Sequence, residues 1–231
     1  MVAGPGEHYF TKQPGAQHVE NRFRAELRAR EFEFFTDAGV FARERVDPGT
    51  RLLVEEVDLG SGAGGGPVRR VLDLGCGWGA IGIAIAGALP EAEVVGVEVN
   101  ERAVDLSRRN ASQNGVRNFR VLTSDATLLS PVELGVEAEP ETRAESGAAG
   151  AVFDLVVSNP PIRAGKAVVW ALVDVAWRFL APGGRLVMVA RTSQGGRSLE
   201  KRLAEVFGDA ATVGRGGGYR LLEARKAGRP E

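Results

Sequence analysis

The sequence has few of the residue types that many specialised sites require. Among 231 residues it contains one cysteine, Cys76, and two histidines, His8 and His18. A single thiol excludes an internal disulfide and a zinc site built from cysteines. A histidine-dependent catalytic triad would have to use one of two residues that both lie near the start of the chain. We therefore expect no bound metal and a chemistry that does not use histidine.

Long apolar runs and an excess of one charge are also absent. No uninterrupted stretch reaches the roughly eighteen apolar residues that cross a membrane, and residues 1–10 lack the apolar core of a signal peptide. The net charge is −1, which disfavours a nucleic-acid binder that acts through bulk charge and leaves a local basic face open. The expectation is a cytoplasmic protein with no membrane partner.

Glycine is abundant, with 31 residues, whereas aromatic residues make up only 6%. This balance is typical of tight turns and buried parallel strands. From Val68 onward, apolar strand-like runs alternate with helical patterns. Strands are expected over residues 71–74, 94–97, 119–123, 153–157, 185–190, 211–213 and 219–224. The alternation predicts an α/β fold with a doubly wound, mostly parallel, seven-stranded Rossmann-like sheet.

The N-terminal part has a different pattern. Apolar and charged residues alternate on both sides of Arg28-Ala29-Arg30, which predicts a β-hairpin within residues 18–36. Asp47-Pro48 then predicts a helix start, and the helix is expected to run to about Leu59. Gly60–Gly66 is expected to be a flexible linker. We therefore divide the chain into a hairpin-and-helix extension, residues 1–66, and a main domain, residues 67–231. Within the latter, residues 131–150 are expected to form a disordered acidic insertion.

The strongest motif is VLDLGCGWGAIG at residues 71–82. A strand leads directly into Gly75 and Gly77, whose backbone amides can approach a ligand at a helix N-terminus. Asp73 at the strand end suits a cationic amino group and opposes a pyrophosphate, although it could instead cap the turn amides. Glu98 ends the second strand, where a carboxylate can accept both ribose hydroxyls. A ribose and an amino acid without a pyrophosphate describe S-adenosylmethionine.

Two further strand ends carry polar side chains. Asp125 follows the third strand and could accept a hydrogen bond from the adenine amino group, or could stabilise a turn. A buried strand also ends in Asn159-Pro160-Pro161. The Asn159 side-chain carbonyl and the Pro160 backbone carbonyl, fixed by the rigid turn, can bind both hydrogens of a planar amine and orient its lone pair toward an electrophile. The alternative is a plain turn that Asn159 caps.

The combination of DLGCGWG, VGVEVN, TSDA and NPPIRAGK resembles the class I S-adenosylmethionine-dependent methyltransferases. More narrowly, it is similar to the small-domain group that contains the bacterial ribosomal small-subunit RNA guanine 2-amino methyltransferases. The resemblance covers nearly the whole chain, because TDAGVFARERVDPGTRLLVE at residues 36–55 and YRLLEARK at residues 219–226 are also similar to that group.

The resemblance implies a role for each motif residue. Asp73, Gly75 and Gly77 would bind the methionine half of S-adenosylmethionine, Glu98 the ribose and Asp125 the adenine. Asn159, Pro160 and Pro161 would form the catalytic turn, with Asn159 also next to the cofactor. In one departure, Ile162 stands where many amine methyltransferases have an aromatic residue, so stacking on the target base would come from Phe41 or Tyr9, or would be absent. Ile162, Arg163 and Lys166 follow the turn and would face the substrate.

The resemblance implies methyl transfer to the 2-amino group of a guanine in ribosomal RNA. Ribosomal RNA or the small subunit would be the partner, with docking through the hairpin, a homodimer or the assembled subunit. Because the turn fixes the amine and not the polymer, adenine in DNA or RNA and protein glutamine remain alternative substrates. An NAD-dependent oxidoreductase and a non-catalytic RNA-binding module are the alternatives from other classes. Asp73 argues against the first, and the intact amine-binding turn argues against the second.

Overall fold

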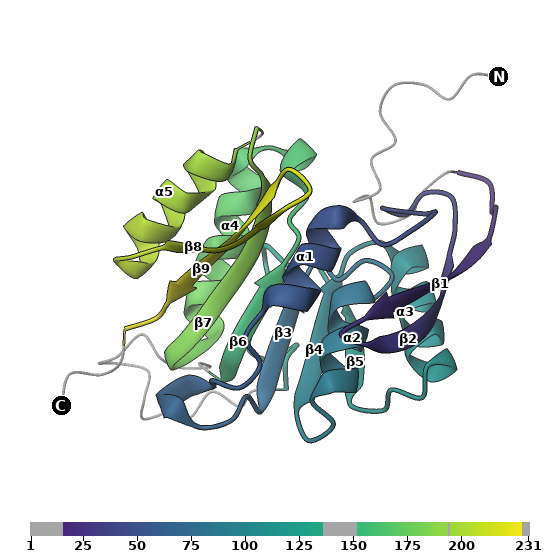
Figure 1. Ribbon diagram of the computed structural model, residues 1–231, viewed down its shortest axis with the longest axis horizontal. Helices are drawn as coiled ribbons and strands as arrows, with labels where there is room; N and C mark the ends of the chain where they lie inside the picture. Colours follow the sequence, from purple (N-terminus) through teal and green to yellow (C-terminus); the bar gives the residue numbers. More distant parts are fainter. Residues whose placement is uncertain (1–15, 136–151, 194, 228–231) are drawn as a thin grey trace.

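The computed structural model describes residues 16–135, 152–193 and 195–227 (Figure 1). A central seven-stranded sheet has the order β5-β4-β3-β6-β7-β9-β8. The five strands from β5 to β7 run parallel, whereas β9 is antiparallel to both β7 and β8. The strands are β3 (Arg70–Leu74), β4 (Glu93–Glu98), β5 (Phe119–Thr123), β6 (Phe153–Ser158), β7 (Leu180–Arg191), β8 (Ala211–Gly216) and β9 (Tyr219–Arg225). The predicted doubly wound, mostly parallel sheet is confirmed.

Helices cover both faces of the sheet. They are α1 (Pro48–Glu56), α2 (Ala80–Ala88), α3 (Glu101–Gln113), α4 (Lys166–Phe179) and α5 (Gly196–Phe207). Alternate residues of each strand enter two separate apolar cores. Val71 and Val187 pack with α1, α2 and α3, whereas Leu72 and Leu186 pack with α4 and α5. This alternation follows from the pleat, which turns successive side chains to opposite faces.

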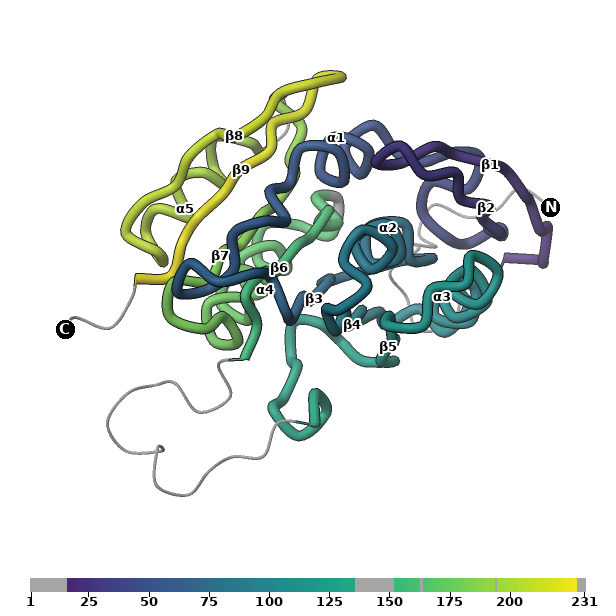
Figure 2. The backbone as a smooth tube through the Cα atoms, turned by 60° about the horizontal axis from the view of Figure 1, so that its bottom comes forward, coloured from purple at the N-terminus to yellow at the C-terminus, as the bar shows by residue number. Residues whose placement is uncertain are grey.

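The predicted hairpin is confirmed as β1 (Asn21–Leu27) and β2 (Arg30–Thr36), paired in antiparallel register. It lies outside α2 and α3 at the β5 end of the molecule (Figure 2). Two asparagines, one in α3 and one directly after it, form hydrogen bonds with the free backbone edge of β2, as a neighbouring strand would. Asn110 exchanges hydrogen bonds of 2.7 and 2.9 Å with the backbone of Phe35, and Asn114 does the same with Glu33 at 2.9 and 2.8 Å. The hairpin is thus fixed to α3 and to the residue that ends it.

Residues 60–66, expected to be a flexible linker, are held against the sheet. Ala63 to Gly65 form a short 3₁₀ turn, and the Ala63 amide donates a hydrogen bond to Asp154 Oδ1 at 3.2 Å. The guanidinium of Arg185, buried within β7, donates bonds of 2.7 Å to the carbonyls of Asp58 and Ser61. Helix α1 ends at Glu56, earlier than expected, and packs on β7, β8, β9 and α2. The division of the chain at residue 66 stays a prediction.

The predicted insertion at residues 131–150 lies mostly outside the described residues. Its first residues are ordered as turns, with the Leu134 side chain fully packed in the α4–α5 core. Glu133 accepts hydrogen bonds from the hydroxyls of Ser124 and Ser130 at 2.5 and 2.6 Å. Disorder is therefore the wrong prediction for residues 131–135, because the apolar Leu134 provides buried surface that a composition-based argument overlooks.

Candidate active site

A cavity of about 350 Å³ lies at the carboxyl ends of β3, β4 and β6, where ligands bind in open α/β sheets. Its volume is within the usual range for small-molecule sites. The glycine loop after β3, the ends of β4 and β6, and helix α4 form most of the wall. Residues 41, 42 and 50 close it from the N-terminal side. Eight of the residues predicted from the sequence line it, namely Phe41, Gly75, Gly77, Glu98, Asp125, Asn159, Pro160 and Pro161.

The glycine loop has the backbone geometry that its sequence predicts. Gly75, Gly77 and Gly79 have φ angles of +74°, +55° and +95°, which favour glycine over residues with a Cβ. A Cβ added at Gly75 or Gly77 would meet no atom within 4 Å, so these positions leave open space beside the cavity. The loop is anchored to β4, because the amides of Gly75 and Cys76 both donate to the Val97 carbonyl. A ligand can therefore approach a fixed backbone.

Asp73 lies beneath this loop and is fully buried. Its Oδ2 accepts a 2.9 Å hydrogen bond from the Gly82 amide in α2, which is the capping role that the sequence allows as an alternative. Its Oδ1 is buried with no hydrogen-bond partner among the described residues. The pKa of Asp73 is raised to about 7, mainly by burial and to a smaller extent by the charge of Glu98. The hydrogen bond from the Gly82 amide opposes this shift. Asp73 is not among the cavity-lining residues, so its contact with a ligand stays a prediction.

Glu98 ties three elements together at the floor of the cavity. Its Oε2 accepts from the Gly77 amide, and its Oε1 accepts from the amides of Val99 and Asn100, all at 2.9 Å. Burial raises the pKa of Glu98, and these three backbone bonds oppose the shift. A carboxylate offers about four acceptor positions. One therefore remains for a ribose hydroxyl, and a second hydroxyl would have to share an oxygen with a backbone amide.

Asp125 borders the cavity from the turn after β5. Its Oδ1 accepts from the amide and hydroxyl of Thr127 at 2.8 and 2.7 Å, so the residue does stabilise a turn. The other oxygen, Oδ2, makes no hydrogen bond to a described residue. It is therefore available as an acceptor, and its role toward adenine stays a prediction.

Two of the remaining predicted substrate residues, Ile162 and Lys166, do not line the cavity. Ile162 is half-buried against the α4–α5 core. Lys166 is the exposed first residue of α4. The backbone of Arg163 lies in the short 3₁₀ helix η3 (Ile162–Ala164). Its side chain, like the whole of Tyr9, lies outside what the structure describes.

Asn159 directly follows β6, and its side-chain amide is held from α1. Its Nδ2 donates to Thr50 Oγ1 at 2.9 Å and to Asp47 Oδ2 at 3.2 Å. The Asp47 carboxylate accepts hydrogen bonds only, so the nitrogen of the amide must face it. No described residue donates to the carbonyl oxygen Oδ1 of Asn159. The amide is therefore fixed by its nitrogen, and its oxygen stays available beside the cavity.

The two prolines shape the chain beyond Asn159. The Pro160 carbonyl accepts a 2.8 Å hydrogen bond from the Ile162 amide, and the Pro161 carbonyl accepts one from Ala164 at 2.8 Å. The Pro160 oxygen, expected to serve a substrate amine alone, is thus already an acceptor within the turn. A carbonyl oxygen has two lone pairs, so one remains for a substrate hydrogen.

The loop between β2 and α1 brings Phe41 to the cavity. The Phe41 side chain is 39% exposed, and its carbonyl accepts a 2.7 Å hydrogen bond from the indole Nε1 of Trp78 in the glycine loop. Asn100, which caps α3, donates from Nδ2 to the Gly39 carbonyl at 3.0 Å. The loop is therefore attached to the glycine loop and to the start of α3, so Phe41 has a defined position at the cavity wall.

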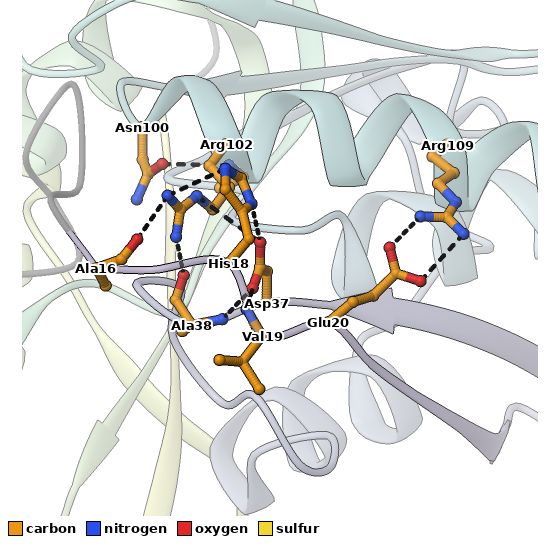
Figure 3. Close-up of polar contacts among 10 residues, drawn as sticks. Ala16, His18, Val19, Glu20, Asp37, Ala38, Asn100, Arg102 and Arg109 are labelled. Carbon is orange, nitrogen blue, oxygen red and sulfur yellow. Dashed lines mark hydrogen bonds and ion pairs between the residues drawn. The ribbon is translucent and has the colours of Figure 1, made fainter.

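A cluster of charged residues strengthens this attachment (Figure 3). Arg102 of α3 donates to the carbonyls of Ala38 and Ala16 at 2.5 and 2.9 Å, and its Nε lies 3.8 Å from Asp37. Asp37 also bonds to His18 Nδ1 at 2.5 Å. The segment that enters the hairpin and the loop that leaves it are thus held together on the first turn of α3.

The sequence prediction missed Asp47 and Thr50 as partners of Asn159, and Trp78 as the anchor of the Phe41 loop. The Asp47-Pro48 pair predicted the start of α1 but gave no sign of which strand end this helix would meet. Asp47 and Asn159 are 112 positions apart. Only the packing of α1 beside the β6 end brings them into contact.

Two further properties of the described residues bear on the chemistry. None of the described helices is both long and apolar enough to cross a membrane. Within the same residues, no group of three or more His, Cys, Asp or Glu side chains is placed to bind a metal ion. Cys76 lines the cavity, but burial raises the pKa of its thiol well above the usual range, which opposes a nucleophilic thiolate.

Comparison with known proteins identifies the fold and the family. The family model of the methyltransferase small domain matches residues 31–223. The chain is 34% identical to uncharacterized protein YbxB of Bacillus subtilis, covering 95% of this chain and 98% of that protein. It is 31% identical to ribosomal RNA large subunit methyltransferase G of Streptomyces avermitilis, covering 82% of this chain and 44% of that enzyme.

A solved structure of a ribosomal RNA methyltransferase is also similar to this chain. The 16S rRNA N2 G1207 methyltransferase (RsmC) of Thermus thermophilus, in complex with AdoMet and guanosine, superposes with a TM-score of 0.69 at 31% identity. The match covers 92% of this chain and 52% of that one. The chain therefore spans about half the length of the named methyltransferases to which it is compared. With its glycine loop, its Asn-Pro-Pro turn and a family match over most of its length, this chain belongs to the methyltransferase small-domain family.

Proposed function

We propose that this protein transfers a methyl group from S-adenosylmethionine to the exocyclic 2-amino group of a guanine in ribosomal RNA. The observation that carries the proposal is the orientation of Asn159. The amide nitrogen donates to Thr50 of α1 and to Asp47, the residue that caps this helix, at 2.9 and 3.2 Å, and its carbonyl oxygen is left for a ligand in the cavity. Its relative RsmC was solved with AdoMet and guanosine, the same pair of ligands that this cavity would hold.

The residues around the cavity fit S-adenosylmethionine. The open glycine loop accommodates a ligand close to its backbone, and the unpartnered Asp73 Oδ1 beneath it offers an acceptor on the side where an ammonium group would bind. Glu98 has acceptor capacity left for ribose, and Asp125 Oδ2 has capacity for the adenine amino group. When bound, S-adenosylmethionine supplies an electrophilic methyl group on its sulfonium sulfur.

The chain's own contribution to the reaction is orientation. The 2-amino group of guanine is conjugated with its ring, so its lone pair is delocalised and poorly nucleophilic. Asn159 Oδ1 and the Pro160 carbonyl would accept its two hydrogens and turn the lone pair toward the methyl carbon. The nitrogen then bonds to that carbon as the carbon–sulfur bond breaks, and the positive charge that develops on nitrogen faces two oxygen acceptors. The excess proton leaves to solvent.

Phe41 would stack on the base in place of the aromatic residue that position 162 lacks. It lies on the cavity wall, whereas Ile162 does not. Arg163 and Lys166 follow the turn in the sequence and would contact phosphates of the RNA. These assignments are part of the proposal, as is the ribosomal RNA partner.

The test uses purified protein, tritiated S-adenosylmethionine and a panel of free ribosomal RNA, small subunits, large subunits and DNA, followed by nucleoside analysis. We expect 2-methylguanosine from one of the ribosomal substrates. Asn159→Ala should slow single-turnover methyl transfer by roughly 10²–10³-fold, the scale of losing one preorganised polar group at a reacting centre. Binding of S-adenosylhomocysteine should not change, because the first three strands hold the cofactor. A different methylated nucleoside, or a folded Asn159→Ala enzyme of normal rate, would contradict the proposal.

A further inference from the structure

We propose that Asp47 is a positioning residue, which orients the Asn159 amide for methyl transfer. The inference rests on the proposed role of Asn159 and extends it to the N-terminal part of the chain. Asp47 precedes α1 and is 9% exposed. It does not line the cavity, so it would act on the substrate only through Asn159.

The carboxylate of Asp47 is saturated with donors from three segments. Oδ2 accepts from the amides of Gly49 and Thr50 at 2.8 and 3.2 Å, and from Asn159 Nδ2 at 3.2 Å. Oδ1 accepts a 3.1 Å bond from the Tyr219 hydroxyl at the start of β9. Capping α1 requires only the first two of these bonds. The other two fix the carboxylate between the ends of β6 and β9, beyond what a helix cap needs.

This arrangement determines which atom of Asn159 reaches the substrate. An asparagine amide can rotate by 180° and exchange its oxygen and nitrogen with little change in shape. In the rotated state, the NH₂ group of Asn159 would face the NH₂ group of the substrate. Both groups are donors, so no hydrogen bond could orient the substrate amine. Asp47 disfavours that rotation because it would place the amide oxygen against a carboxylate oxygen. Thr50 Oγ1 alone cannot do so, since a hydroxyl both donates and accepts.

Two substitutions separate capping from positioning. Asn and Ser cap helices about as well as Asp, so Asp47→Asn and Asp47→Ser should both fold. In Asp47→Asn, the side-chain oxygen can remain at the position of Oδ2 and still accept from Asn159. In Asp47→Ser, the shorter hydroxyl can cap α1 but no longer reaches the Asn159 nitrogen, which keeps only the Thr50 hydroxyl as an acceptor. Only the serine variant should therefore release the amide.

We expect Asp47→Ser to lower the single-turnover rate about 10- to 100-fold, the scale of a small misplacement of a reacting group. Asp47→Asn should stay within about threefold of the wild-type rate. Affinity for S-adenosylhomocysteine should be unchanged in both. Val54→Ala, which removes buried methyl groups from the same helix, is the control for a merely weakened α1 and should retain the wild-type rate below its melting temperature.

A double-mutant cycle tests whether Asp47 acts through Asn159. In the Asn159→Ala background, Asp47→Ser should cause no further loss of rate. Equal activity of the Asn and Ser variants, or a full additional loss in that background, would overturn the inference. So would Asn159→Ala with a normal rate, because there would then be no amide to position. A methylated product other than 2-methylguanosine would contradict the proposed function alone. In that case, the contrast between Asp47→Asn and Asp47→Ser would still support the positioning role.

A second measurement reads the amide directly, without substrate. The side-chain NH₂ of Asn159 should show two resolved NMR signals that exchange slowly with water in the wild type and in Asp47→Asn. In Asp47→Ser this protection should decrease. Protection that is identical in the two variants would show that Thr50 alone holds the amide, and would also overturn the inference.

Discussion

The buried carboxylate of Asp73 should make the stability of the ligand-free protein depend on pH. Burial raises the pKa of this side chain from 3.8 to about 7. Between these two values the folded protein retains a proton that the unfolded chain has lost. Stability is therefore greatest below about pH 4 as far as this group is concerned, and it is lost as the pH rises toward 7.

The size of the effect follows from the shift. Each pKa unit corresponds to about 1.4 kcal/mol, and most of the titration of the folded state lies above pH 6. Between about pH 5 and pH 8, Asp73 alone should lower the free energy of unfolding by about 2.5 kcal/mol. Asp73→Asn removes the charge while its side-chain oxygen can still accept from the Gly82 amide. The variant should therefore gain about this much stability relative to wild type over the same range.

Urea unfolding at four pH values between about 5 and 8 measures this difference. Asp58→Asn is the control, because the pKa of Asp58 is lowered by a hydrogen bond from the Gly60 amide. The Asp58 carboxyl is therefore ionised in both the folded and the unfolded state above about pH 5, so Asp58→Asn should leave the pH slope of stability between about pH 5 and 8 unchanged. Stability curves of wild type and Asp73→Asn that stay parallel across the range would refute the reasoning.

Two further predictions concern the insertion and the base-stacking residue. Leu134→Ala should destabilise the protein by about 2–4 kcal/mol because it opens a cavity in a packed core. Replacing residues 137–150 with a glycine linker should shift the melting temperature by less than about 2 °C. Thermal unfolding measures both variants, and a larger loss of stability from the linker than from Leu134→Ala would show that the interpretation of this segment is wrong. Phe41→Ala should lower kcat/KM for RNA about tenfold through loss of base stacking, with S-adenosylhomocysteine affinity unchanged, and Phe41→Tyr should retain the wild-type value. An RNA KM that does not respond to Phe41→Ala would assign the stacking to another residue.

Features encoded by neighbouring residues could be predicted from the sequence. The hairpin follows from alternating residues around a turn, and the glycine loop and the Asn-Pro-Pro turn follow from residue types with restricted or unusual backbone geometry. Gly75 and Pro160 therefore lie where their motifs place them. The strands of the sheet were also predicted, except that β7 begins at Leu180 and includes the turn-like sequence Pro182-Gly183-Gly184. Pairing with β6 and β9 extends that strand beyond its local propensity.

Contacts between distant segments could not be predicted in this way. Asn110 and Asn114 lie one helical turn apart on α3, and a polar pair at this spacing usually faces solvent. Here both bind the backbone of β2. The same limit applies to Glu98, whose three bonds to backbone amides depend on how the glycine loop meets the start of α3. Each side chain could be identified as a polar residue at a strand or helix end, but its partner depended on tertiary packing.

The N-terminal part contributes to the core of the molecule as well as to the wall of the cavity. Leu27 and Phe34 of the hairpin and Leu53 of α1 belong to the same apolar core as Ile83 of α2. The hairpin therefore buries the outer side of the helices that support the cofactor site. In the same part of the chain, Thr50 of α1 and its capping residue Asp47 accept the hydrogen bonds of the Asn159 amide. A main domain reduced to residues 67–231 would retain the glycine loop and the Asn-Pro-Pro turn in its sequence. It would lose Asp47 and Thr50, which in the proposed mechanism fix the orientation of the Asn159 amide. Because α1 packs on α2 as well as on β7 and β9, the proposed cofactor binding and amine orientation both depend on this N-terminal part.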